Sequence, residues 1–266
     1  METVETVNKW DYKVALRNLK TVDEFGNIVN SRFATADENT GDIIGLVGGR
    51  YKLIQNKTIY DVMQNVGNEL KLKLTKIFVS KGKRSTIFKY SFGETLEREV
   101  ENPLEKNDRI QFGFEIINSF DMGLPTSQFR AFAERLVCLN GLTIPKLISR
   151  FSFRDLNDFR EDRVKEEIGN RIAPIVSTMD IWNQWTKVTP NRIKVSDLVN
   201  NRLQKKAAET LLTNYDNGKD KSIWGLYNMV TFHSSHEVKT KNLENIRLRQ
   251  YEVEALANDF YTADLK

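Results

Sequence analysis

Residues 72–92 read LKLTKIFVSKGKRSTIFKYSF, and this stretch decides the kind of fold to expect. Apolar and polar residues alternate on both sides of a short polar segment that contains one glycine. This pattern is typical of two antiparallel strands joined by a tight turn. Phe88, Tyr90 and Phe92 fall on one side of the second strand, which we expect to face a core. We therefore predict a β-hairpin with its tip at residues 80–84.

The rest of the N-terminal half also favours strands. Residues 12–16, 43–47 and 109–118 carry short apolar or alternating runs, and Gly48 and Gly49 allow a turn after the second of them. A helix over residues 58–70 is the exception, because its apolar residues recur at helical spacing and Thr58 and Asp61 have capping-box spacing. Residues 129–142 fit either a helix or a strand.

The C-terminal part is expected to be helical. Apolar residues from Val164 to Trp182 follow steps of three and four, with Pro174 predicting a kink or two abutting helices. Ser196 and Ser222 are expected to cap two further helices. Segregated strands and helices predict an α+β fold, with an antiparallel β-sheet in the N-terminal half and a helical C-terminal half packed on it. The expected division is residues 1–154 and 155–266.

Composition restricts the class of protein. The chain has 266 residues, of which 40% are hydrophobic, and a formal net charge of +4. It contains no apolar run of the roughly 20 residues that a membrane-spanning helix needs, and residues 1–5 do not resemble a signal peptide. Cys138 is the only cysteine, so no internal disulfide can form. We expect a soluble protein of the cytoplasm, with no membrane partner.

Few residues suggest catalysis. His233 and His236 are the only histidines, and two ligands are too few for a zinc site. Cys138 lies among apolar neighbours and has no base assigned to it, which favours a buried small residue over a nucleophile. No phosphate-binding or dinucleotide-binding glycine motif is present. We expect no enzyme activity, no cofactor and no metal; a metal-dependent nuclease is the enzyme class considered.

The clearest charge feature is the hairpin itself. Residues 70–93 contain no Asp or Glu, and the cations of such a hairpin can neutralise phosphates. The other interpretation is an edge hairpin on which lysines prevent aggregation. The candidate nucleic-acid contacts are Lys71, Lys73, Lys76, Lys81, Lys83, Arg84 and Lys89, with Arg50, Arg130 and Arg135 as weaker additions.

Four segments also occur in a characteristic order. Residues 48–56, 117–123, 135–141 and 223–231 read GGRYKLIQN, INSFDMG, RLVCLNG and IWGLYNMVT. Together they resemble the phage/plasmid-like family known as domain of unknown function 932, in which the second segment often reads Asn-Ser-His-Asp-Gly. Here Phe120 replaces the histidine and Met122 precedes Gly123. Any catalytic role of that histidine would be lost in this chain.

The resemblance implies a product of a mobile element. By analogy with phage single-strand annealing proteins, we expect a protein that binds or anneals single-stranded DNA in recombination or replication, and that forms homo-oligomers. The alternative is a protein-interaction module that inhibits a host defence or a host enzyme.

Overall fold

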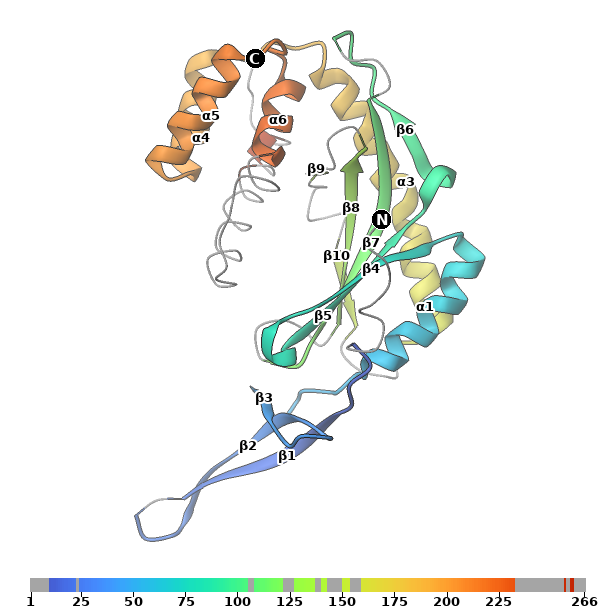
Figure 1. Ribbon diagram of the computed structural model, residues 1–266, viewed down its shortest axis with the longest axis vertical. Coiled ribbons are helices and arrows are strands. Elements are labelled where there is room, and N and C mark those ends of the chain that lie inside the picture. The colour runs from blue at the N-terminus through green and yellow to red at the C-terminus, as the bar shows by residue number, and fades with distance from the viewer. Residues whose placement is uncertain are drawn as a thin grey trace. The chain divides into compact units, whose positions relative to one another are not determined.

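The computed structural model describes residues 10–22, 24–104, 108–121, 127–136, 140–142, 150–153, 159–232, 256 and 259–260. The predicted α+β class is confirmed, with antiparallel strands in the N-terminal half and helices in the C-terminal half (Figure 1). The strands are β1 Val14–Val22, β2 Ile28–Asp37, β3 Ile43–Val47, β4 Lys73–Val79, β5 Ser85–Ser91, β6 Glu97–Glu99, β7 Arg109–Ser119, β8 Ser127–Arg135, β9 Asn140–Leu142 and β10 Arg150–Phe153. The helices are α1 Asn56–Leu70, α3 Glu161–Trp185, α4 Arg192–Arg202, α5 Lys205–Asn217 and α6 Ile223–Phe232, with short 3-10 turns η1 Lys81–Lys83 and η2 Gly93–Leu96.

The chain divides into two compact units. Unit 1 comprises residues 1–95, 113–131 and 150–170, and unit 2 comprises residues 96–112, 132–149 and 171–266. Each unit therefore combines strands with helix, whereas the sequence suggested one boundary at residues 154 and 155. The difference arises because β7, β8 and α3 are long enough to contribute residues to both units.

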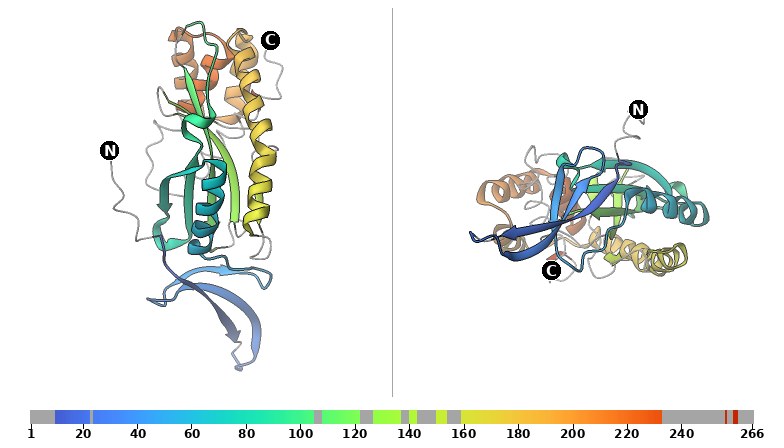
Figure 2. Two further views of the ribbon diagram at one scale, coloured as in Figure 1. Left: turned by 90° about the vertical axis from the view of Figure 1, so that its right-hand side faces the viewer. Right: turned by 90° about the horizontal axis from the view of Figure 1, so that it is seen from below.

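Two sheets form from these strands. β1, β2 and β3 pair in that order, and Figure 2 shows β1 and β2 as a long twisted ribbon. The second sheet has the order β10-β8-β7-β5-β4, with β6 added to β7 and β9 added to β8. β4 is consequently an edge strand, while β5 lies between β4 and β7.

The core of unit 1 lies on one face of the second sheet. The Trp10 ring packs against Phe88 of β5 and Tyr60 of α1, with centroids 5.6 Å and 4.7 Å away. Further along this face, Phe129 of β8 contacts Phe159, which lies two residues before α3, with ring centroids 6.1 Å apart. We call this side of the sheet the helix face.

The core of unit 2 is built around tryptophans. Phe112 stacks on Trp182 with the ring planes 1° apart, and Trp182 contacts Trp224 at 5.6 Å. α3 is one helix that contains Pro174, so two abutting helices do not form there. Of the ambiguous segment 129–142, residues up to Arg135 belong to strand β8 and residues 140–142 form β9, while residues 137–139 lie outside the described part of the chain.

Helix starts were predicted with mixed success. The Ser222 hydroxyl accepts a bond from the Gly225 N–H at 3.1 Å, as expected of a cap. The Ser196 prediction is wrong, because α4 begins earlier and Asn191 caps it. The predicted capping box at the start of α1 is also wrong: the helix begins at Asn56, and Asp61 pairs with Lys57 instead.

Candidate nucleic-acid interface

The predicted hairpin forms, and its register places two lysines directly opposite each other. Lys76 of β4 is the cross-strand partner of Lys89 of β5, and Ile77 is the partner of Phe88. Phe88 lies on the helix face, so Lys76 and Lys89 lie on the other side of the sheet. We call that side of unit 1 the open face. Phe88, Tyr90 and Phe92 are buried, as the alternation predicted.

The register continues the charged positions across the open face. Lys89 is the partner of Glu115 in β7, and the Glu115 carboxylate binds Arg130 of β8 at 2.5 Å. Arg130 is in turn the partner of Arg150 in β10. We call these five side chains the charged row; it contains four cations and one carboxylate. Sequence reasoning missed Arg150, although its alternation with Phe151 and Phe153 in β10 is a usable signal.

Lys71 and Lys73 lie at the junction of α1 and β4. Lys71 ends α1 in the left-handed conformation, with φ of 58°, and its N–H donates to the Gly67 carbonyl. Lys73 begins β4 opposite Ser91. Both side chains are exposed. They therefore extend the basic surface along the edge strand.

The hairpin tip is tied to the first sheet. Lys83 forms an ion pair with Asp37 of β2, whose side chain is 2% exposed. The hydrogen bond from Lys83 lowers the pKa of Asp37, against the opposing effect of burial. The Lys83 ammonium also lies 5.0 Å from the centre of the Tyr12 ring. Lys83 therefore stabilises the fold of unit 1. Its neighbour Arg84 is exposed and accessible to a ligand. The Lys81 side chain is outside the described residues.

The three arginines proposed as weaker contacts differ in their surroundings. Arg50 is exposed in the turn after β3. Arg130 is bound to Glu115, as described above. Arg135 is buried in unit 2, where its Nε and Nη2 atoms donate to the Asp108 carboxylate at 2.5 Å and 2.8 Å. A guanidinium in this position cannot meet a polyanion, so Arg135 is withdrawn from the interface.

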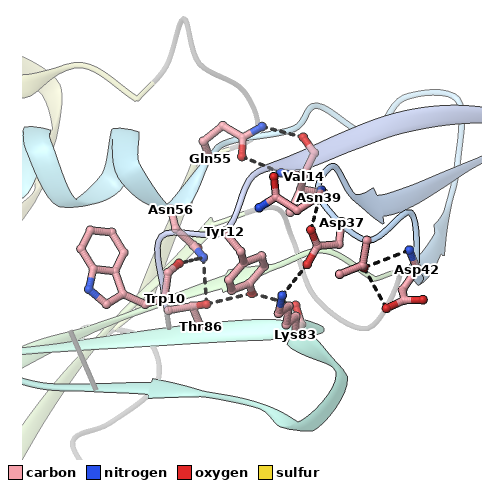
Figure 3. A network of polar contacts seen from close by, with 11 residues as sticks. Trp10, Tyr12, Val14, Asp37, Asn39, Asp42, Gln55, Asn56, Lys83 and Thr86 are labelled. Atoms are coloured by element: carbon pink, nitrogen blue, oxygen red, sulfur yellow. Dashed lines mark hydrogen bonds and ion pairs between the residues drawn. The ribbon is translucent and has the colours of Figure 1, made fainter. Parts of the chain in front are cut away.

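A chain of polar side chains runs through the interior of unit 1 (Figure 3). The Tyr12 hydroxyl lies 3.1 Å from the Thr86 hydroxyl, which also accepts a bond from Asn56 Nδ2 at 3.0 Å. Beyond the view of the figure, Asn118 Nδ2 donates to Asn56 Oδ1 at 2.9 Å, and the Ser127 hydroxyl donates to Asn118 Oδ1 at 3.2 Å. Burial raises the pKa of Tyr12, so its hydroxyl stays protonated and can donate. These bonds connect β5, α1, β7 and β8.

Hydrogen bonds from side chains to backbone groups complete the junction between the two sheets of unit 1. The Gln55 side-chain amide donates to the Val14 carbonyl at 2.7 Å and accepts from the Val14 N–H at 3.1 Å. The Thr35 hydroxyl donates to the Phe120 carbonyl at 2.5 Å. A Cβ added to Gly45 would lie 2.8 Å from that same carbonyl oxygen, so only glycine fits this approach. The first sheet is therefore fixed to the second, and its position supports the hairpin tip.

Three residues were considered above as metal ligands or as a nucleophile. These residues, His233, His236 and Cys138, lie outside the described part of the chain. Within the described residues, no three His, Cys, Asp or Glu side chains form a group that could hold a metal ion. Across the same part of the chain, no helix has the length and apolar composition that crossing a membrane requires.

Comparison with known families identifies the chain. The family model named domain of unknown function (DUF932) matches residues 43–257. The protein belongs to this family. Searches of curated proteins and of solved structures found no match.

The four segments that carry the DUF932 resemblance meet in two buried clusters. In unit 1, the first two segments meet where Asn56 and Asn118 bind each other. In unit 2, the last two meet at Asp108, which accepts bonds from Arg135 and, at 3.1 Å, from Trp224 Nε1. Asn118 is 0% exposed and so is Asp108. These buried hydrogen bonds join the segments inside each unit, which indicates that the segments stabilise the fold.

Proposed function

We propose that this DUF932 protein binds single-stranded nucleic acid through the exposed cations of the β4–β5 hairpin. Lys71, Lys73 and Lys76 are exposed along the edge of the second sheet, in a stretch without acidic residues. Cations arranged in this way can neutralise successive phosphates and release their counterions. The open face of unit 1 would then receive the strand beside the charged row.

The observation that carries the proposal is the direct pairing of Lys76 with Lys89. Like charges placed opposite each other in a sheet are destabilising, so the repulsion between these two lysines lowers the stability of the fold. Protection of a sheet edge accounts for Lys73 and Lys76, which lie on the edge strand β4. Lys89 lies on the interior strand β5, where the single carboxylate of Glu115 faces it and also binds Arg130, so the charged row keeps an excess of positive charge. A bound polyanion would offset the repulsion.

The biological role we propose follows from the family resemblance and the basic hairpin. The protein would bind or anneal single strands during recombination or replication of a phage or plasmid, in the cytoplasm of the host cell. It would do so as a homo-oligomer, since annealing brings two strands together. Light scattering with and without an oligonucleotide tests this part of the proposal.

Fluorescence anisotropy with a labelled oligonucleotide tests the interface. The test variant replaces Lys71, Lys73 and Lys76 with Ala. The control replaces Lys205, Lys206 and Lys219 of unit 2, which are also exposed lysines and carry the same total charge. The tip cations are poor targets, because removing Lys83 also removes the ion pair with Asp37.

The wild-type affinity should fall steeply with salt. Each lost phosphate contact on a single strand should flatten the slope of log K against log salt by about 0.7, so the test variant should lose about 2. The control should keep the wild-type slope. Equal losses in both variants would mean that only net charge matters, and the hairpin would not be the interface. Failure of the wild type to bind, with a host protein retained in a pull-down, would favour the interaction-module alternative.

A further inference from the structure

We infer that the open face also contacts the bases of the bound strand, through an apolar row next to the charged row. This inference rests on the proposed function and specifies its ligand. Phe78 of β4 is the cross-strand partner of Ile87 in β5, and Ile87 is the partner of Ile117 in β7. Phe78 lies two residues after Lys76, so both project from the same face of the strand.

The apolar row is accessible to a ligand. Phe78 is 43% exposed, and Ile87 and Ile117 are half-buried. This contrasts with Phe88 on the adjacent strand, which is fully buried on the helix face. Single exposed apolar residues are common on protein surfaces, whereas here three apolar side chains on adjacent strands form one row beside the charged row.

The two rows have complementary chemistry at a suitable spacing. Residues i and i+2 of a strand lie about 7 Å apart on one face, so the apolar and charged rows run side by side across the sheet. The Lys76 ammonium lies 4.5 Å from the centre of the Phe78 ring. A bound phosphate can draw the Lys76 ammonium away from the ring, which then leaves that face of Phe78 for a base.

Only an unpaired strand can use both rows. In a duplex the base faces are stacked on one another and cannot meet a side chain of the sheet, whereas single strands offer them freely. A protein partner fits the surface less well, because a row of three side chains is far smaller than the roughly 800 Å² per partner of a stable interface. The structure thus favours single-stranded nucleic acid over duplex and over protein.

The test compares three labelled probes at one salt concentration. They are an oligothymidylate of about 16 nucleotides, an abasic strand of the same length, and a duplex. The variants are Phe78→Ala and Phe78→Tyr, and the control is Phe25→Ala, which removes an 81%-exposed phenylalanine from the turn between β1 and β2. Thermal melting confirms that each variant is folded.

Phe78→Ala should weaken oligothymidylate binding about 5- to 150-fold, the ratio that corresponds to 1–3 kcal/mol of stacking. Abasic-strand affinity and the salt slope should stay unchanged, because the phosphate contacts remain. Phe78→Tyr should bind like the wild type, since it keeps an aromatic face, and so should Phe25→Ala. The wild type should bind the duplex more weakly than the single strand.

The outcomes separate the two proposals. If the wild type binds none of the probes, the proposed function itself fails. If it binds oligothymidylate with a steep salt dependence but Phe78→Ala binds equally well, only the base contact is refuted. The base contact is also refuted if Phe78→Ala loses the same factor on the abasic strand, or if the wild type prefers the duplex.

Discussion

Replacing Lys76 and Lys89 with Ala, singly and together, measures whether the paired lysines repel each other in the folded protein. A double-mutant cycle isolates the pair from every other contact of each lysine, including that of Lys76 with the Phe78 ring. We expect an unfavourable coupling free energy. The double variant should therefore be more stable than the sum of the two single effects indicates.

The magnitude follows from the register. Directly opposed Cβ atoms lie about 5 Å apart, and two unit charges at that distance in water repel by about 0.8 kcal/mol. Flexible lysine stems can move the ammonium groups to about 10 Å, where the repulsion is about 0.4 kcal/mol. At about 10 mM salt the Debye length is about 30 Å, so most of this remains. At about 1 M salt it is about 3 Å, and the coupling should approach zero.

Urea unfolding of the four proteins at both salt concentrations provides the measurement. An unfavourable coupling that disappears in high salt would support the view that the open face is electrostatically strained without a polyanion. A favourable coupling, or one that salt does not change, would refute this reasoning. It would mean that neighbouring groups such as Glu115 already compensate both lysines, and the main support for a nucleic-acid ligand would be lost.

Three further substitutions test the scaffold of the two units. Asn118→Ala should lower the free energy of unfolding by about 1–3 kcal/mol, since its buried partners lose a donor and an acceptor; chemical denaturation measures this, and an unchanged midpoint would contradict it. Lys83 lowers the pKa of Asp37, so their pair should stabilise unit 1 fully above the usual Asp pKa of about 3.9 and lose this contribution as the pH falls through the lower folded pKa. Melting temperatures across this range should therefore fall less steeply in Asp37→Asn than in the wild type, and parallel curves would argue against the pair. Asp108→Asn should destabilise by about 3–5 kcal/mol, because Arg135 stays buried without its carboxylate; calorimetry that finds a loss below about 1 kcal/mol would disprove this.

The elements predicted correctly are those specified by nearby residues. The alternation in residues 72–92 predicted the hairpin because a strand with one buried face repeats every two residues. Ser222 was recognised as a cap because its bond reaches only three residues along the chain. Residues 129–142 stayed ambiguous since their apolar spacing fits both periods. β8 forms there because β7 and β10 supply hydrogen-bond partners, which no local pattern records.

The predictions of helix starts failed where the capping side chain or its partner was not the one that local spacing suggested. Ser196 looked like a cap, yet Asn191 accepts the first N–H bonds of α4. At the start of α1, Gln55 is occupied with the backbone of Val14, and Asn56 is occupied with Thr86. These partners lie 30 or more residues away along the chain. Local spacing therefore could not identify them.

The sequence by itself determined the fold class, the hairpin, and the absence of acidic residues from it, because these depend on residue types and short-range periodicity. Only the tertiary structure decided which cations remain exposed for a ligand. It paired Lys83 with Asp37 and buried Arg135 against Asp108, and it aligned Lys76 and Lys89 with Arg150 of a distant strand. The physical reason is that neutralisation and exposure of a charge depend on which side chains strand pairing brings within a few ångströms, and the chain order does not contain that information.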